Sequence, residues 1–106
     1  MAKTTLIHVT AADNELYLIA TKAGLQSAEI VHLSSGFNNP VEYKVVPQSI
    51  LEAGNYTLII VGINWGGPFQ FTVALTQGGP PVVITSGAPT NGPVGVTFTK
   101  AVPMTV

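Results

Sequence analysis

Residues 56–76 read YTLIIVGINWGGPFQFTVALT, and this stretch gives the clearest indication of the fold class. In its second half, Phe69–Thr76, two sets of side chains alternate. Phe69, Phe71, Val73 and Leu75 fall on one face, and Gln70, Thr72, Ala74 and Thr76 fall on the other. This alternation with a period of two predicts a β-strand with one face on the core and the other facing water or a partner.

The first half of the stretch, Tyr56–Ile63, is apolar on both faces. A strand of this kind is usually central in its sheet, so we expect both of its faces to be covered. The short Gly-rich loop Asn64–Pro68 separates the two strands. Loops of this length typically close an antiparallel hairpin, which is the connection we predict here.

On either side of this stretch, further segments rich in β-branched and aromatic residues are separated by turns that contain Gly, Pro or Asn, and Asp13-Asn14 is one of these predicted turns. They are Thr4–Thr10, Glu15–Thr21, Glu29–Leu33, Val41–Val46, Pro81–Thr85 and Val94–Val102. With residues 56–76 they make about eight short strands. The pattern predicts an all-β, single-domain antiparallel β-sandwich of Greek-key or jelly-roll type over residues 1–106. Within Pro47–Ala53, both a single helical turn and a plain crossover fit the sequence.

The run Leu51-Glu52-Ala53-Gly54-Asn55-Tyr56-Thr57-Leu58 resembles the tyrosine corner of Greek-key sandwiches. In that motif, a Tyr at the start of a strand bonds back across the preceding crossover and fixes how two sheets join. The resemblance implies a structural role for Leu51, Gly54 and Tyr56. The alternative is a Tyr that only packs at the end of a strand.

Residues 77–93 differ from the rest of the chain, because Gly and Pro dominate them and one short apolar segment, Val82–Ile84, interrupts them. Two roles fit this composition. The segment is either a connection leading to a last strand or an arm that pairs with another subunit.

Asp, Glu, Lys, Arg and His are absent from Ala53 to Thr99, and charged residues make up only 8% of the chain, which carries a net charge of -1. Typical domains hold about 25% charged residues. The chain has no Arg, and its four Lys are dispersed, so we expect no nucleic-acid partner. It has no Cys, which excludes disulfides.

Neither a signal peptide nor an apolar run of transmembrane length is evident in the sequence. The default expectation for localisation is therefore the cytoplasm, with export by another route left open. A membrane-active protein with inserting strands is a minor alternative, because the strands are short and only one alternates clearly.

Catalytic chemistry would have to use the charged residues of the first half. These candidates are His8, Asp13, Glu15, Glu29, His32, Glu42 and Lys44. No nucleophile elbow, zinc-ligand spacing or Gly-rich phosphate motif accompanies them. We therefore expect no enzymatic activity, no metal site and no cofactor.

Trp65 lies in the loop Asn64-Trp65-Gly66-Gly67-Pro68, where it is either exposed for binding or folded back to cap the core. If it is exposed, its flat face can stack on a sugar ring. The amides of Asn64, Asn38 and Asn39 would then bond sugar hydroxyls. These four residues are the predicted ligand-binding set of a lectin-like module for a neutral glycan.

The leading functional prediction is a non-catalytic binding protein that forms a homo-oligomer through its charge-poor second half. Interface cores are depleted of charge and enriched in aromatic residues, as this half is. A chain with a net charge near zero and such a surface tends to associate. The lectin-like reading is the alternative, and self-association would supply the multivalency that weak glycan binding needs.

Overall fold

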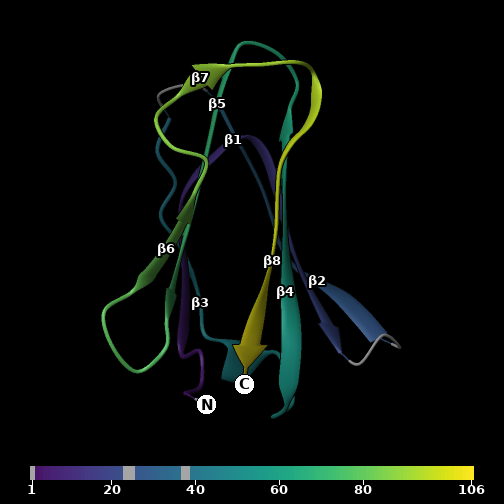
Figure 1. The fold of residues 1–106 in the computed structure, drawn as a ribbon, viewed down its shortest axis with the longest axis vertical. Helices are drawn as coiled ribbons and strands as arrows, with labels where there is room; N and C mark the ends of the chain where they lie inside the picture. Colours follow the sequence, from purple (N-terminus) through teal and green to yellow (C-terminus); the bar gives the residue numbers. More distant parts are fainter. Residues whose placement is uncertain (1, 23–25, 37–38) are drawn as a thin grey trace.

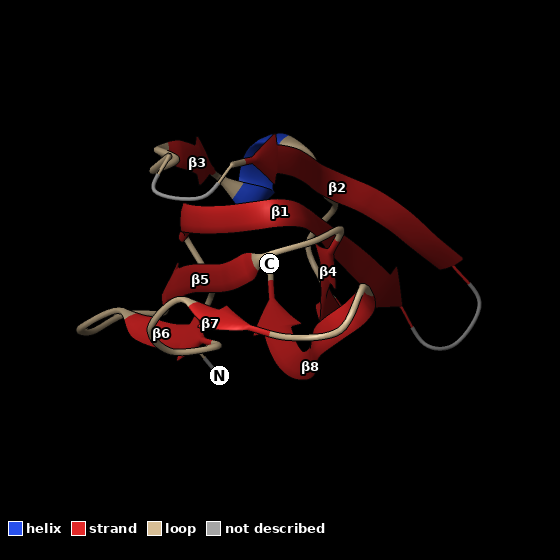
Figure 2. Ribbon diagram, turned by 90° about the horizontal axis from the view of Figure 1, so that it is seen from above, coloured by secondary structure: helices blue, strands red, loops and turns tan. Residues whose placement is uncertain are grey.

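A computed structural model describes residues 2–22, 26–36 and 39–106. In these residues, eight strands form one antiparallel sheet that curls into a half-barrel (Figures 1 and 2). The strands are β1 (Leu6–Lys22), β2 (Gln26–Ser35), β3 (Tyr43–Val45), β4 (Asn55–Asn64), β5 (Pro68–Thr76), β6 (Val82–Thr85), β7 (Thr90–Asn91) and β8 (Gly95–Thr105). The all-β prediction is confirmed. In the described part of the chain, no helix is long and apolar enough to cross a bilayer.

The long strand β1 organises the sheet, because its two halves pair with different neighbours. Its first half pairs with β3 and β5, and its second half pairs with β2 and β4. The partner changes at Asp13-Asn14, a cis peptide that the sequence marks as a turn between two strands. The turn prediction is wrong, because β1 continues through Asp13-Asn14 as a bent strand. Backbone pairing with β2 on one side and β5 on the other includes Asp13 in the sheet.

The predicted hairpin of β4 and β5 is wrong, because β1 lies between these strands in the order β6-β5-β1-β4-β8. The sheet has two arms: the first half of β1 with β3, β5, β6 and β7, and the second half of β1 with β2, β4 and β8. The loop after Asn64 crosses from the second arm to the first. The strands β4 and β5 nevertheless contact each other without backbone pairing. The ring of Phe71 on β5 lies so close to Gly62 on β4 that a Cβ atom at Gly62 would sit 2.6 Å from it.

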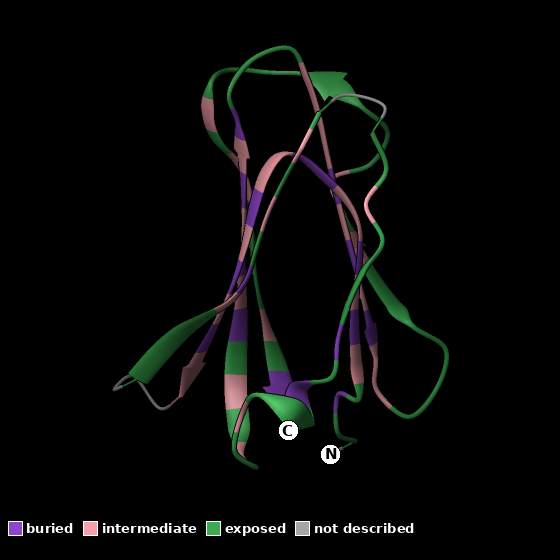
Figure 3. Cartoon of the chain, turned by 180° about the vertical axis from the view of Figure 1, so that it is seen from behind, coloured by how far each residue is buried: buried purple, intermediate pink, exposed green. Residues whose placement is uncertain are grey.

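Buried residues alternate with less buried ones along the strands (Figure 3), and the buried hydrophobic residues form one core cluster to which both halves of β1 contribute. Phe71, Val73 and Leu75 are at most 1% exposed, so the predicted inward face of Phe69–Thr76 is confirmed for these three residues. The ring of Phe71 also stacks on Phe98 of β8, with 6.0 Å between centroids. The apolar faces of both arms therefore meet at Phe71.

The crossover before β4 contains a short 3₁₀ helix, η1 (Pro47–Ser49), with Pro at its first position, in line with the helical-turn alternative. After it, the hydroxyl of Tyr56 donates to the carbonyl oxygen of Glu52 at 2.7 Å, which is the bond that defines a tyrosine corner. Gly54 exchanges two backbone hydrogen bonds with Val106 and so ties this corner to the end of the chain. Leu51 packs against the core from the same crossover.

Residues 77–93 pair within their own chain. The strands β6 and β7, which this segment contains, both bond to β5. In this chain the segment connects β5 to β8.

Candidate functional site

One face of the arm built from β2, β1, β4 and β8 points away from the core. On β4, Ile59, Val61 and Ile63 alternate with buried residues and are themselves only half-buried. Their cross-strand partners continue the same face on both sides. We call the uncharged part of this face the outer strip, made up of Ile19, Ile59, Val61, Ile63, Val96, Thr99 and Ala101.

The outer strip departs from what the sequence predicts for Tyr56–Ile63. Both faces of this strand were expected to be covered. The described chain fully covers the face that carries Leu58 and Ile60, but it leaves the opposite face half-buried. The strip extends to Val96, which is 60% exposed and lies on β8 at the end of the strand order. A row of aliphatic side chains on a sheet face is thus accessible from outside.

At one end of the outer strip, four side chains gather into what we call the aromatic corner: Glu15, Tyr17, His32 and Trp65. Glu15 is at its centre. Its Oε2 lies 2.5 Å from Nε2 of His32, and its Oε1 accepts the indole N–H of Trp65 at 2.9 Å. The hydroxyl of Tyr17 donates to Oε2 at 3.3 Å, and the ring of Tyr17 stacks on His32 with 4.2 Å between centroids.

The surroundings of the corner shift the pKa values of two of its members, Glu15 and Tyr17. The hydrogen bond from His32, followed by that from Trp65, lowers the pKa of Glu15 below its ordinary value. Loss of solvation, followed by the nearby Glu15 charge, raises the pKa of Tyr17. Glu15 is therefore held ionised with both oxygens engaged, so it anchors its neighbours and is poorly suited to donate a proton.

Trp65 is exposed, with 61% of its surface accessible, so it does not fold back to cap the core. Two hydrogen bonds hold it in place. Its backbone N–H donates to Oδ1 of Asn14 at 2.6 Å, and its indole N–H donates to Glu15. The side chain is thus presented on the surface in a defined position.

Asn64, predicted to bind a ligand, is fully buried and supports the loop instead. Its Nδ2 group donates to the carbonyl oxygens of Gly67, Gly92 and Pro93 at 3.1 to 3.2 Å. Its Oδ1 accepts the N–H of Gly66. No part of this amide remains for a ligand, because the Gly-rich loop offers several backbone groups that need a buried partner.

The other two predicted amides do not join Trp65. Asn38 lies outside the described residues, and Asn39 lines a separate cavity beside the bend of β1. Trp65 instead belongs to a cluster with Glu15, Tyr17 and His32. The sequence pattern did not predict that these residues lie near Trp65. The alternation within β1 places Glu15 and Tyr17 on one face, but only the strand pairing brings His32 beside them.

The two histidines are in different arms of the sheet. His8 pairs with Glu42 at 2.8 Å and lies opposite Lys44 on β3, whereas His32 pairs with Glu15. In the part of the chain that the structure describes, no three His, Cys, Asp or Glu side chains form a group that could hold a metal ion.

Comparisons of this chain with family models, curated proteins and solved structures give no match. A function must therefore be inferred from the outer strip and the aromatic corner.

Proposed function

We propose that this protein is a non-catalytic binding protein that self-associates by apposing the outer strips of two copies. The observation that carries the proposal is the row Ile59, Val61 and Ile63, which is half-buried on an uncharged part of the sheet face. The one charged residue of β8, Lys100, is the register partner of the inward-facing Ile60 and so belongs to the opposite face. Burying such a row removes apolar surface from water at about 25 cal/mol per Å². We also propose that the two arms function as the layers of a Greek-key sandwich, and the Tyr56 corner supports this reading.

The position of the charged residues favours a second copy of the chain as the partner. Glu15 on β1 is the register partner of Ile63, and Glu29 on β2 is the register partner of Ile19. Both carboxylates therefore border the outer strip on its β2 side. Interfaces typically have such an apolar centre and a polar rim. A two-fold axis through the strip would bring identical rows together, and a stable interface of this kind needs about 800 Å² from each partner.

The test places a charge in the centre of the strip. Val61→Lys is expected to convert the oligomer to a monomer in sedimentation velocity, because the ammonium group would have to be desolvated in the interface. Val83→Lys on β6 is the matched control. Val83 is 59% exposed and lies on the other arm, so this variant should keep the oligomer.

Circular dichroism checks that both variants remain folded. A wild-type protein that sediments as a monomer at the highest attainable concentration would contradict the proposal. So would a folded Val61→Lys variant with the wild-type oligomeric state.

A second candidate function is neutral-glycan binding at the aromatic corner, favoured by the exposed and doubly anchored Trp65. The negative face of an aromatic ring attracts the C–H groups of a sugar, and a fixed ring loses little entropy on binding. One such site supplies about 4 kcal/mol, or roughly millimolar affinity. Self-association would present several sites and strengthen binding through multivalency.

Tryptophan fluorescence titration of the wild type and a glycan array test this candidate. Because Trp65 is the only Trp of the chain, the variants are compared on the array. There, Trp65→Ala should abolish binding, whereas Val94→Ala, which truncates a side chain that is 65% exposed, should leave it intact. Equal binding by Trp65→Ala and the wild type would rule out the corner as the site.

A further inference from the structure

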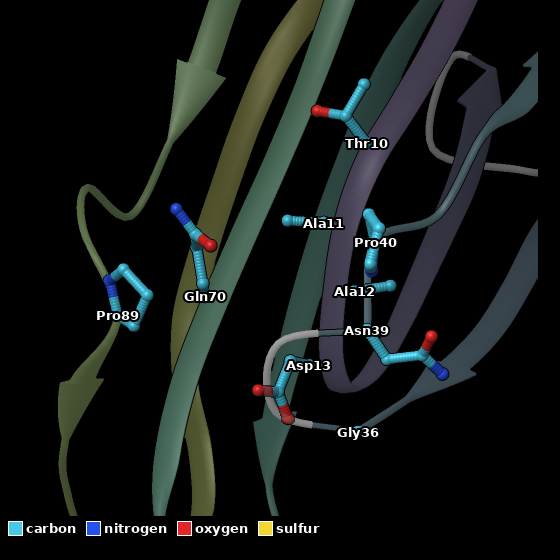
Figure 4. Close-up of a pocket in the computed structure, with 9 residues that line it drawn as sticks. All are labelled: Thr10, Ala11, Ala12, Asp13, Gly36, Asn39, Pro40, Gln70 and Pro89. Atoms are coloured by element: carbon cyan, nitrogen blue, oxygen red, sulfur yellow. The ribbon is translucent and has the colours of Figure 1, made fainter.

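A cavity of about 260 Å³ lies beside the bend of β1, apart from the residues of the outer strip and the aromatic corner (Figure 4). Asp13 of β1 and Gln70 of β5 are register partners in the sheet and both line it. Asn39 and Pro40 line it from the segment before β3, and Pro89 lines it from the segment between β6 and β7. The cavity is smaller than the roughly 300–1,000 Å³ typical of sites for drug-sized ligands, so it suits a small group.

Hydrogen bonds hold the surrounding segments in place. The N–H of Val41 donates to the carbonyl oxygen of Thr10 on β1 at 3.2 Å, and the hydroxyl of Ser35 donates to the carbonyl oxygen of Asn39 at 2.5 Å. These bonds attach the segment around Asn39 to the strands beside it. The cavity is thus a built feature of the fold.

Asp13 is only 6% exposed, and it is the one titratable residue that lines the cavity. Its Oδ1 accepts a hydrogen bond from Nδ2 of the adjacent Asn14. Among the described residues, no Lys or His forms an ion pair with it. Burial raises the pKa of this carboxyl, an effect that the Asn14 bond partly offsets. A carboxylate has about four acceptor positions, so most of its capacity remains for another donor.

Gln70 adds a second acceptor. Its Nε2 donates to the carbonyl oxygen of Gly87 at 3.1 Å, which engages the donor end of the amide. Figure 4 shows its oxygen turned toward the β1 side of the cavity, where Asp13 lies. The side chains of Asp13 and Gln70 therefore offer acceptors, one of them able to carry a negative charge, while Pro40 and Pro89 offer apolar surface.

We propose that this cavity binds a primary alkylammonium group, with the ammonium on Asp13 and Gln70 and the alkyl chain against Pro40 and Pro89. An ammonium group has three donors and no acceptor, which complements this set of side chains. It also neutralises a buried carboxylate that lacks a cationic partner in the described chain, whereas a neutral alcohol does not.

Two-dimensional NMR with n-butylammonium chloride tests the proposal, and n-butanol serves as the neutral control of similar shape. We expect shifts of the amides of Ala12, Asp13, Asn39 and Gln70 to saturate with a dissociation constant of about 1 mM. Asp13→Asn preserves the shape but removes the charge, and it should weaken binding by about tenfold or more. Butanol should produce much smaller shifts at the same positions.

A second measurement uses only the wild-type protein, so it does not depend on how a variant folds. Binding of a cation must lower the pKa of Asp13, which carbon-detected NMR can follow directly. An unchanged Asp13 pKa at high butylammonium concentration overturns the proposal, as do equal responses to the amine and the alcohol. Nα-acetyl-lysine methylamide distinguishes the two sources of the group. If it binds as butylammonium does, the site also accepts a lysine side chain, and if it does not, the site takes free amines.

Discussion

Replacing Gly62 by Ala tests the packing between the two arms of the sheet. The new Cβ atom would lie 2.6 Å from two ring carbons of Phe71 and 2.8 Å from a third. The ring is fully buried and stacks on Phe98, so it must move by about 0.8 Å to reach the 3.4 Å of an ordinary contact. Overpacking of this kind costs about 1–3 kcal/mol. For a chain of this size, a loss of 2 kcal/mol lowers Tm by roughly 10 °C.

Urea unfolding followed by circular dichroism measures this loss. Gly79→Ala is the matched control, because a Cβ atom there meets nothing within 4 Å and should change the free energy of unfolding by about 0.5 kcal/mol or less. In a Phe71→Leu background, Gly62→Ala should cost less, since the clashing ring is absent. If Gly62→Ala is as stable as Gly79→Ala, the close packing of β4 on β5 is refuted.

Three further changes test individual contacts. Tyr56→Phe removes the hydrogen bond to the Glu52 carbonyl oxygen and should lower the free energy of unfolding in urea by about 0.5–1.5 kcal/mol. An unchanged free energy of unfolding would mean that this hydrogen bond does not stabilise the fold. Asn64→Ala leaves several loop carbonyls without a partner and should cost about 2–4 kcal/mol, with a lower Tm as the readout. The pKa of Glu15 is lower in the folded than in the unfolded protein, so its stabilising effect is present above its ordinary pKa and lost as the pH falls below it. The stability advantage of the wild type over Glu15→Gln should therefore shrink as the pH falls below 4.5, the ordinary pKa of a Glu side chain, and a constant difference would contradict this linkage.

Local pattern was enough to predict the strands and much of the core. The alternation of Phe71, Val73 and Leu75 places these residues inward because successive side chains of a strand point to opposite faces. The same reasoning failed at Asp13-Asn14, where residues typical of turns lie within β1. Strands on both sides of β1 bond its backbone there, and local propensity does not include these non-local bonds.

The candidate site was predicted only in part. The aromatic residue Trp65 was identified from its Gly-rich loop, but its anchor Glu15 lies 50 residues away in sequence. Asn64 was assigned to ligand binding because its amide, next to Trp65 in the sequence, can hydrogen-bond sugar hydroxyls. Its burial depends on carbonyl groups of residues 92 and 93, which reach it only after the chain has passed through β5, β6 and β7.

Composition and the period-two alternation were sufficient to identify an all-β chain with a charge-poor second half. The direction in which that half faces depends on the tertiary structure. By bending β1 and sending β4 and β5 to its opposite halves, the fold leaves Ile59, Val61 and Ile63 on an outer face and sets Trp65 beside Glu15. Strand order and register come from long-range backbone pairing and from the close contact of Phe71 with Gly62, and no short stretch of sequence contains these interactions.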